Sequence, residues 1–316
     1  MILDNSFRVF ANKSGLIWRV LLYELVCILL LCGIALASCY SLFTILSADG
    51  FISDVGDFIT ANLFNFRIDQ ILQGISVLFN DFLVIISLNI AQLLPFVIIL
   101  FLIFGVLGSV IMGLVELPLI ECIYGYMGSC SRLNFMGYFI SNLGRSLKFR
   151  LTKLITSVPL DLCIILAFFG LLQLFTIGGI LNILAPFIMV LALIVLIAIR
   201  QSLFAEWGAC IVVNNTTIWK GFRDNFRNIR KNYKSILGSV VISVILAFAI
   251  NYGLSALTCG VGLFISIPAT IVFFNVMYNV IYFHLNGLRY YIDKDRIITP
   301  KKLEDQERIG DMKNLI

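Results

Sequence analysis

The sequence predicts an all-α, polytopic integral membrane protein with six transmembrane helices arranged as three hairpins. Hydrophobic residues make up 60% of the 316 residues, and charged residues make up 13%, with a mean hydropathy of +1.00. A soluble domain has about 45–50% apolar and about 25% charged residues. The apolar residues also form runs of the length that crosses a bilayer, which takes about 20 residues. This composition excludes soluble, disordered and fibrous proteins.

Six apolar runs give the predicted spans, at residues 20–46, 82–115, 154–175, 180–199, 236–256 and 261–283. The second run is longer than a perpendicular span needs, so we expect tilt or a bend. Pro118, just beyond it, should break or kink the helix. Residues 47–81 mix polar and apolar residues at roughly helical spacing, which predicts interfacial helices. Residues 1–290 then form the transmembrane domain and residues 291–316 a charged, solvated cytoplasmic tail.

The basic residues predict the orientation. All of the 23 lysines and arginines except Arg67 fall on one side if both termini, residues 122–153 and residues 200–234 share that side. The positive-inside rule makes this side cytoplasmic. The acidic residues between the first two spans then face outward, and both termini are cytoplasmic.

The topology also predicts an internal repeat. The chain reads three times as a short aromatic-basic helix, a span, an outer turn and a second span. The spacing from Glu121 to Arg145 equals the spacing from Glu206 to Arg230, which relates the second unit to the third. Three units in one orientation would be parallel repeats, a pattern known among transporters. The units begin at Ser6, near Leu133 and at Ile218.

Residues 218–234 have the pattern of a helix that lies in a membrane interface. At about 100° per residue, one face is apolar and the adjoining arc is cationic. The polar run at residues 214–217 should cap its amino terminus. Each basic residue near an anionic membrane surface contributes about 1 kcal/mol, so the cations are candidate contacts for lipid headgroups or a protein partner. The apolar face holds Ile218, Trp219, Phe222, Phe226, Ile229 and Tyr233, and the cations are Lys220, Arg223, Arg227, Arg230, Lys231 and Lys234.

Polar residues inside the predicted spans offer a second hypothesis. A charged side chain within a span is costly and therefore a functional candidate. Glu24, Asp161 and the pair Asn275 and Asn279, one turn apart, could line a polar path. Amides in a helical bundle also hydrogen-bond across helices, for about 1 kcal/mol each, which is the structural alternative. Carboxylates at span ends can likewise pair with arginines, and Arg200 with Glu206 is such a candidate pair.

The sequence predicts that the protein is not an enzyme. It contains no P-loop, no GxSxG or HExxH motif and no paired-carboxylate hydrolase motif. The single histidine and the lack of CxxC argue against a zinc or redox site, so no metal or cofactor is predicted. An intramembrane enzyme therefore ranks below the other hypotheses, and nucleic acid is not an expected partner.

Arg200, Glu206, Thr217 and the segment Trp219–Phe222 resemble the cytoplasmic stretch of a broad bacterial group. This group comprises six-helix proteins similar to the membrane domain of glycerophosphodiester phosphodiesterases, many of them stand-alone. The resemblance covers most of the chain in architecture and residues 200–222 in motif. Thr217 stands where serine is usual and no phosphodiesterase barrel is attached, so the enzymatic activity does not carry over. The resemblance implies a stand-alone protein of the bacterial cytoplasmic membrane.

Two functions follow as hypotheses. The first is a non-enzymatic scaffold that organises membrane lipids, with anionic headgroups as the expected partner, or organises a protein partner or a homo-oligomer. The alternative is a small-solute or ion transporter whose polar path is lined by Glu24, Asp161, Asn275 and Asn279.

Overall fold

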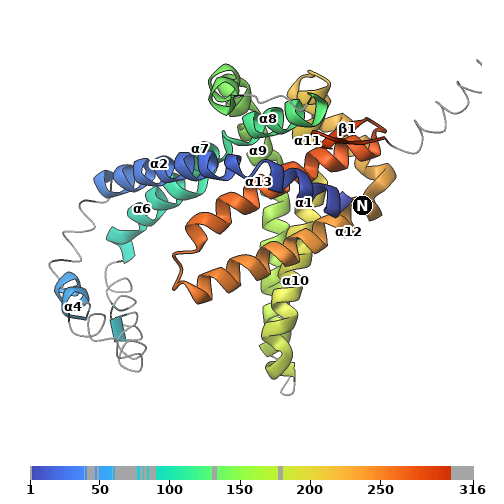
Figure 1. Ribbon diagram of the computed structural model, residues 1–316. Helices are drawn as coiled ribbons and strands as arrows, with labels where there is room; N and C mark the ends of the chain where they lie inside the picture. Colours follow the sequence, from blue (N-terminus) through green and yellow to red (C-terminus); the bar gives the residue numbers. More distant parts are fainter. Residues whose placement is uncertain are drawn as a thin grey trace, which may run out of the picture. The chain divides into compact units, whose positions relative to one another are not determined.

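The computed structural model describes residues 2–38, 40, 47, 50–58, 60, 77–78, 81, 84, 90–129, 134–176 and 181–299 (Figure 1). These residues are almost entirely helical and include six helices long and apolar enough to cross a membrane. The prediction of an all-α, six-span membrane protein is therefore confirmed. The six candidate spans are Gly15–Ser38, Leu94–Ser129, Phe135–Leu171, Ile188–Val213, Ile218–Leu257 and Leu263–Leu285.

The chain divides into two compact units, and residues 25–111 form the smaller one. Its elements are most of α2 (Gly15–Ser38), α4 (Phe51–Phe58), α6 (Ile90–Leu100), the π-helix η2 (Phe101–Gly108) and the start of α7 (Ser109–Gly113). Leu31 and Ala35 of α2 pack on Ile103 of η2, which makes the first hairpin. The π-helical stretch is the irregularity expected in the long second apolar run. Most of residues 59–89 lies outside the described residues.

The larger unit holds the other two hairpins. Its elements are α1 (Ile2–Asn12), α8 (Glu116–Ser129), α9 (Phe135–Thr176), α10 (Leu181–Phe204), α11 (Trp207–Val213), α12 (Ile218–Leu257), α13 (Leu263–Leu285), β1 (Tyr290–Asp293) and β2 (Arg296–Ile298). Helix α9 packs on α10, and α12 packs on both α10 and α13 (Figure 1). The short helices α8 and α11 also pack on each other.

One of the three repeat units differs from the expected separate interfacial helices. Helix α9 is continuous over 42 residues, so its basic segment runs directly into its span. Helix α12 consists of two helices joined across a kink at Asn232, which separates its basic segment from the following span as predicted. Pro159 lies inside α9, and the backbone of Asn232 departs from helical geometry within α12 (φ −126°, ψ 19°). In the first unit, a turn at residues 13–14 separates α1 from α2.

The break expected at Pro118 occurs just before it. A turn at residues 114–115 separates α7 from α8, and Pro118 is the third residue of α8. Proline is tolerated in the first turn of a helix because the amide hydrogens there have no partner within the helix. The short helix α8 therefore starts where the proline permits it.

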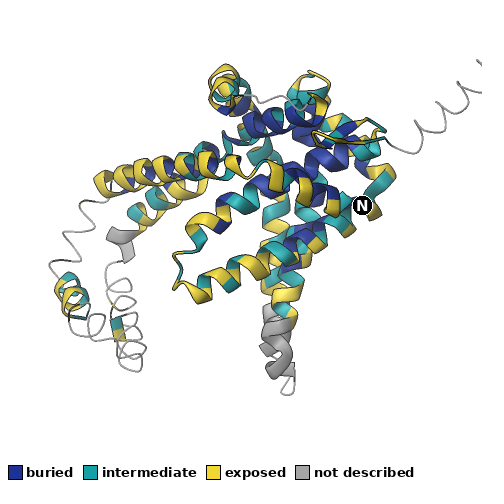
Figure 2. Cartoon of the chain, viewed as in Figure 1, coloured by how far each residue is buried: buried dark blue, intermediate teal, exposed yellow. Residues whose placement is uncertain are grey.

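Burial in the larger unit concentrates where α8, α11, α13 and β1 meet (Figure 2). Helix α13 is the central span, because 61% of the residues in its most apolar stretch are buried. The corresponding share for α9 is 6%. The exposed side chains of the outer spans are large and apolar, as in Leu166 and Phe169 of α9. Such surfaces suit contact with lipid. The tightest packing thus lies among the short helices at one end of the spans.

The predicted carboxyl-terminal boundary of the folded domain, at residue 290, is wrong. Residues 290–298 form a β-hairpin, with Tyr290 opposite Ile298, where a solvated tail was expected from residue 291. Tyr290 and Ile292 are each 1% exposed, whereas Asp293 is exposed. This inward-outward alternation is the period-two signal of a strand. The folded domain therefore extends through the hairpin, and residues 300–316 lie outside the described residues.

Helix α1 holds this hairpin in place. The side-chain amide of Asn5 donates a hydrogen bond of 2.7 Å to the hydroxyl of Tyr290. Asn12 donates one of 3.0 Å to the carbonyl oxygen of Ile292. Burial raises the pKa of Tyr290 above its ordinary value, and the bond from Asn5 acts in the opposite direction. The two ends of the described chain are thereby joined.

Candidate functional site

The break between α10 and α11 positions the basic half of α12. Helix α10 ends at Phe204, and the fully buried Asn225 of α12 bridges the break. Its side chain accepts a hydrogen bond of 3.0 Å from the backbone N–H of Glu206 and donates one of 2.8 Å to the carbonyl of Leu203. Backbone groups left unpaired at helix ends are costly when buried, and Asn225 satisfies two of them.

A second set of contacts fixes the start of α12. The guanidinium of Arg145 on α9 donates to the carbonyls of Ile211 (3.0 Å) and Thr216 (3.1 Å) at the end of α11. The buried indole of Trp207 donates to the carbonyl of Ile218 at 3.0 Å. Thr217 is the N-cap, as the sequence predicts, although its side chain makes no capping hydrogen bond. The start of α12 is therefore fixed by Arg145 from α9 and by Trp207 from α11.

The surface of α12 divides into three arcs rather than the predicted two. Gly221, Asn225 and Ile229 are buried against the protein. Trp219 and Phe226 are 64% and 42% exposed, so these two aromatic side chains face outward beside the cations, whereas Phe222 is half-buried against Trp207. The expectation of a single apolar face is wrong for Ile229, because the helix needs one side to pack on α10 and α11. The outward surface is an aromatic stripe that borders a cationic one.

The cations of α12 make no polar side-chain contact within the described part of the chain. All six predicted contact residues are exposed, and none forms an ion pair or side-chain hydrogen bond with another residue that the structure describes. Arg145, Arg150, Lys153 and Arg200 all have such partners. As far as the described residues go, the charges of α12 are therefore left to an external anion. The six are Lys220, Arg223, Arg227, Arg230, Lys231 and Lys234.

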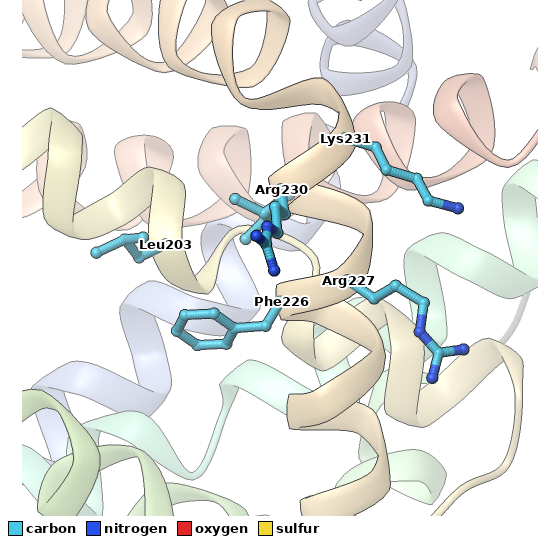
Figure 3. A pocket seen from close by; sticks show the side chains of 6 residues that line it. Leu203, Phe226, Arg227, Arg230 and Lys231 are labelled. Atoms are coloured by element: carbon cyan, nitrogen blue, oxygen red, sulfur yellow. The ribbon is translucent and has the colours of Figure 1, made fainter.

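Two adjacent grooves lie on this surface and share Phe226. The first, of about 450 Å³, is lined by Trp219, Phe222, Arg223 and Phe226. In the second, Figure 3 shows Leu203 of α10 on the same side as Phe226 and Arg230, while Arg227 and Lys231 extend to the other side of α12. Each groove thus combines an apolar wall with at least one guanidinium. The second, of about 520 Å³, is lined by Leu203, Phe226, Arg227, Ile229, Arg230 and Lys231.

The predicted pairing of Arg200 with Glu206 is wrong. The guanidinium of Arg200 donates to both carboxylate oxygens of Asp161 across the α9–α10 hairpin. Glu206 is fully buried beyond the helix break, where it accepts a hydrogen bond of 3.0 Å from Asn228. Helix α10 ends at Phe204, so the break between α10 and α11 separates Glu206 from the helix that carries Arg200.

A second polar cluster was missed by the sequence reasoning. Glu116 of α8 accepts a hydrogen bond from Lys153 of α9 and forms an ion pair with Arg150 at 3.6 Å. Lys153 also interacts electrostatically with Arg200. The hydroxyl of Tyr278 on α13 donates to Gln201 of α10 nearby. In the sequence, Glu116 is visible as a carboxylate that follows an apolar run and precedes a basic segment. That pattern does not show which basic residue is its partner.

The second and third repeat units share one kind of contact between a glutamate and an asparagine. Glu121 of α8 accepts a hydrogen bond from Asn142 of α9, and Glu206 accepts one from Asn228 of α12. In both units, a glutamate in or just before the short helix (α8 or α11) thus accepts a hydrogen bond from the long helix that follows (α9 or α12). Arg145 interacts electrostatically with Glu121, as its spacing suggested, but Arg230 has no ion-pair partner among the described residues.

None of the residues proposed to line a polar path is among those that line the two grooves. Asp161 is paired with Arg200. The amides of Asn275 and Asn279 donate within α13, to the carbonyls of Ile271 and Asn275, at 2.8 and 2.9 Å. Glu24 is 9% exposed and makes no hydrogen bond or ion pair with another described residue. The transporter hypothesis draws no support from these contacts.

Comparison with known proteins returns no relative. No family model, curated protein or solved structure matches the chain. The six helices make it a multi-pass membrane protein.

Proposed function

We propose that this chain is a non-enzymatic protein of the bacterial cytoplasmic membrane that organises anionic lipids through α12. The observation that supports this most is a set of six exposed cations that have no ion-pair partner among the described residues and lie beside the exposed side chains of Trp219 and Phe226. Aromatic side chains favour the level of the lipid headgroups, and lysine and arginine reach phosphates from there. A helix with this division of side chains suits the membrane interface.

The orientation is part of the same proposal. The basic ends of α9 and α12 lie on the cytoplasmic side, as the positive-inside rule favours. The inner leaflet carries the anionic lipids that attract basic segments. Both termini then lie in the cytoplasm.

Neutralising the arginines of α12 should weaken the binding of anionic lipid. The variant Arg223→Gln, Arg227→Gln, Arg230→Gln loses three cations at about 1 kcal/mol each, which corresponds to about a hundredfold in affinity. Native mass spectrometry of the full-length protein in detergent, titrated with phosphatidylglycerol and with phosphatidylcholine, measures both affinities. We expect the loss for phosphatidylglycerol alone.

The matched control removes three exposed cations elsewhere. Arg8→Gln, Lys294→Gln, Arg296→Gln changes the net charge equally and leaves α12 intact. Unchanged phosphatidylglycerol binding in the α12 variant, or an equal loss in the control, would contradict the proposal. Retained binding of a protein partner instead of lipid would favour the partner-scaffold form of the hypothesis.

A further inference from the structure

We propose that the two grooves flanking Phe226 form one bipartite site for a single lipid molecule that carries two phosphodiester groups. This inference rests on the proposed lipid-binding function and names the class of lipid. Arg223 lines one groove and Arg230 the other, and both grooves have Phe226 as a wall. The geometry assigns one phosphate to each of these arginines.

The spacing of the arginines supports two linked anions. Arg223, Arg227 and Arg230 follow at i, i+4 and i+7, so they form one stripe along α12. Arg223 and Arg230 are two turns apart, which is about 10 Å along the axis. Arg227 lies between them in the sequence, and its side chain extends to the other side of α12 from Phe226 and Arg230 (Figure 3). Guanidinium groups suit this role because their planar N–H donors match phosphate oxygens.

The apolar walls provide for acyl chains on both sides of Phe226. Trp219 and Phe222 line the first groove, and Leu203 and Ile229 line the second. A lipid with two phosphodiesters carries acyl chains on each side of its headgroup bridge. Its two halves would therefore lie on either side of the Phe226 ring.

Charge and rigidity agree with this assignment. Arg223 and Arg230 provide one cation for each of the two phosphodiester charges, and none of the residues that line either groove is acidic. The buried Asn225 fixes this part of α12 to the break between α10 and α11. The arginine spacing is thus set before the lipid binds, which reduces the ordering cost of binding.

The test compares diphosphatidylglycerol with phosphatidylglycerol, supplied at equal phosphate concentration to the full-length protein in detergent. Native mass spectrometry reports the number of lipids bound and the two affinities. We expect one diphosphatidylglycerol bound at least about tenfold more tightly, because linkage makes the second phosphate contact intramolecular. Arg223→Gln and Arg230→Gln should each abolish this preference, and the double variant should lose no more. Lys231→Gln, which changes a lysine of the second groove, should weaken the binding of both lipids equally and preserve the preference for diphosphatidylglycerol.

The outcomes separate this inference from the function on which it rests. Equal affinities for the two lipids in the unchanged protein, with anionic lipid still preferred over phosphatidylcholine, would overturn the bipartite site alone. Single variants that each keep part of the preference, with the remainder lost only in the double variant, would also overturn it, since they indicate two independent lipids. Absence of any preference for anionic lipid would overturn the proposed function itself. The two arginines are exposed, so their replacement leaves the core contacts in place.

Discussion

Replacement of Glu116 with glutamine should destabilise the protein by about 3–5 kcal/mol, the cost of removing one partner of a buried ion pair. The side chains of Glu116, Lys153 and Arg150 are 15%, 16% and 23% exposed, so little water reaches them. Without the carboxylate, two cations would face each other with Arg200 close by. Thermal and denaturant unfolding of the purified full-length protein measures the change.

Two further variants make this prediction specific. Asp4→Asn removes the i, i+4 pair with Arg8 on α1, whose side chains are 62% and 48% exposed, and solvent screening should limit its cost to about 1 kcal/mol or less. Lys153→Met combined with Glu116→Gln should recover part of the lost stability, because one unpaired cation is removed. Equal losses for Glu116→Gln and Asp4→Asn would show that the cluster around Glu116 has no special role.

Replacement of Asn225 with alanine should cost about 2–4 kcal/mol, because it leaves two buried backbone groups without partners, at about 1–3 kcal/mol each. These are the N–H of Glu206 and the carbonyl of Leu203. Since the same bonds anchor α12, the affinity for anionic lipid should fall as well. Unfolding of the purified protein and lipid titration measure the two effects.

Thr217→Ala is the control for Asn225→Ala. Thr217 is the N-cap of α12 but makes no side-chain capping bond, so its loss should change stability by less than about 0.5 kcal/mol. If Asn225→Ala were as stable as the unchanged protein, the break between α10 and α11 would have to be held by other contacts.

The sequence predicted the spans because the bilayer sets their length and polarity. Long apolar runs identify a span without knowledge of its neighbours. The cations of α12 were equally visible, since helical periodicity places Arg223, Arg227 and Arg230 on one arc. Both predictions depend on local pattern, and the structure agrees with the spans.

Features that depend on distant contacts were not predictable. Glu116 and Lys153 meet because α8 packs on α9, and no local pattern indicates that α8 folds back. Asn225 looks like any polar residue of a basic helix until the break opposite it is known. Ile229 reads as part of the outward apolar face, although α12 turns it toward the protein.

The β-hairpin was missed for a different reason. The alternation of Tyr290, Tyr291 and Ile292 is short, and charged residues follow it directly. Its stability depends on Asn5 and Asn12, which lie at the opposite end of the chain. An isolated two-stranded hairpin is at best marginally stable in water, so the tertiary contact decides the structure.

The most direct test of the account concerns the two ends of α12. The part of α12 that follows the kink at Asn232, residues 233–257, is about 38 Å long, which is enough to cross the roughly 30 Å of the hydrocarbon core. Cys259, exposed in the turn after α12, and a cysteine introduced by Lys220→Cys can be labelled separately in intact cells with a membrane-impermeant thiol reagent. The other cysteines are replaced by alanine in both variants. The account predicts labelling of Cys259 from outside and of the Lys220→Cys variant after permeabilisation alone. Labelling of Lys220→Cys in intact cells would contradict the cytoplasmic placement of the cationic surface.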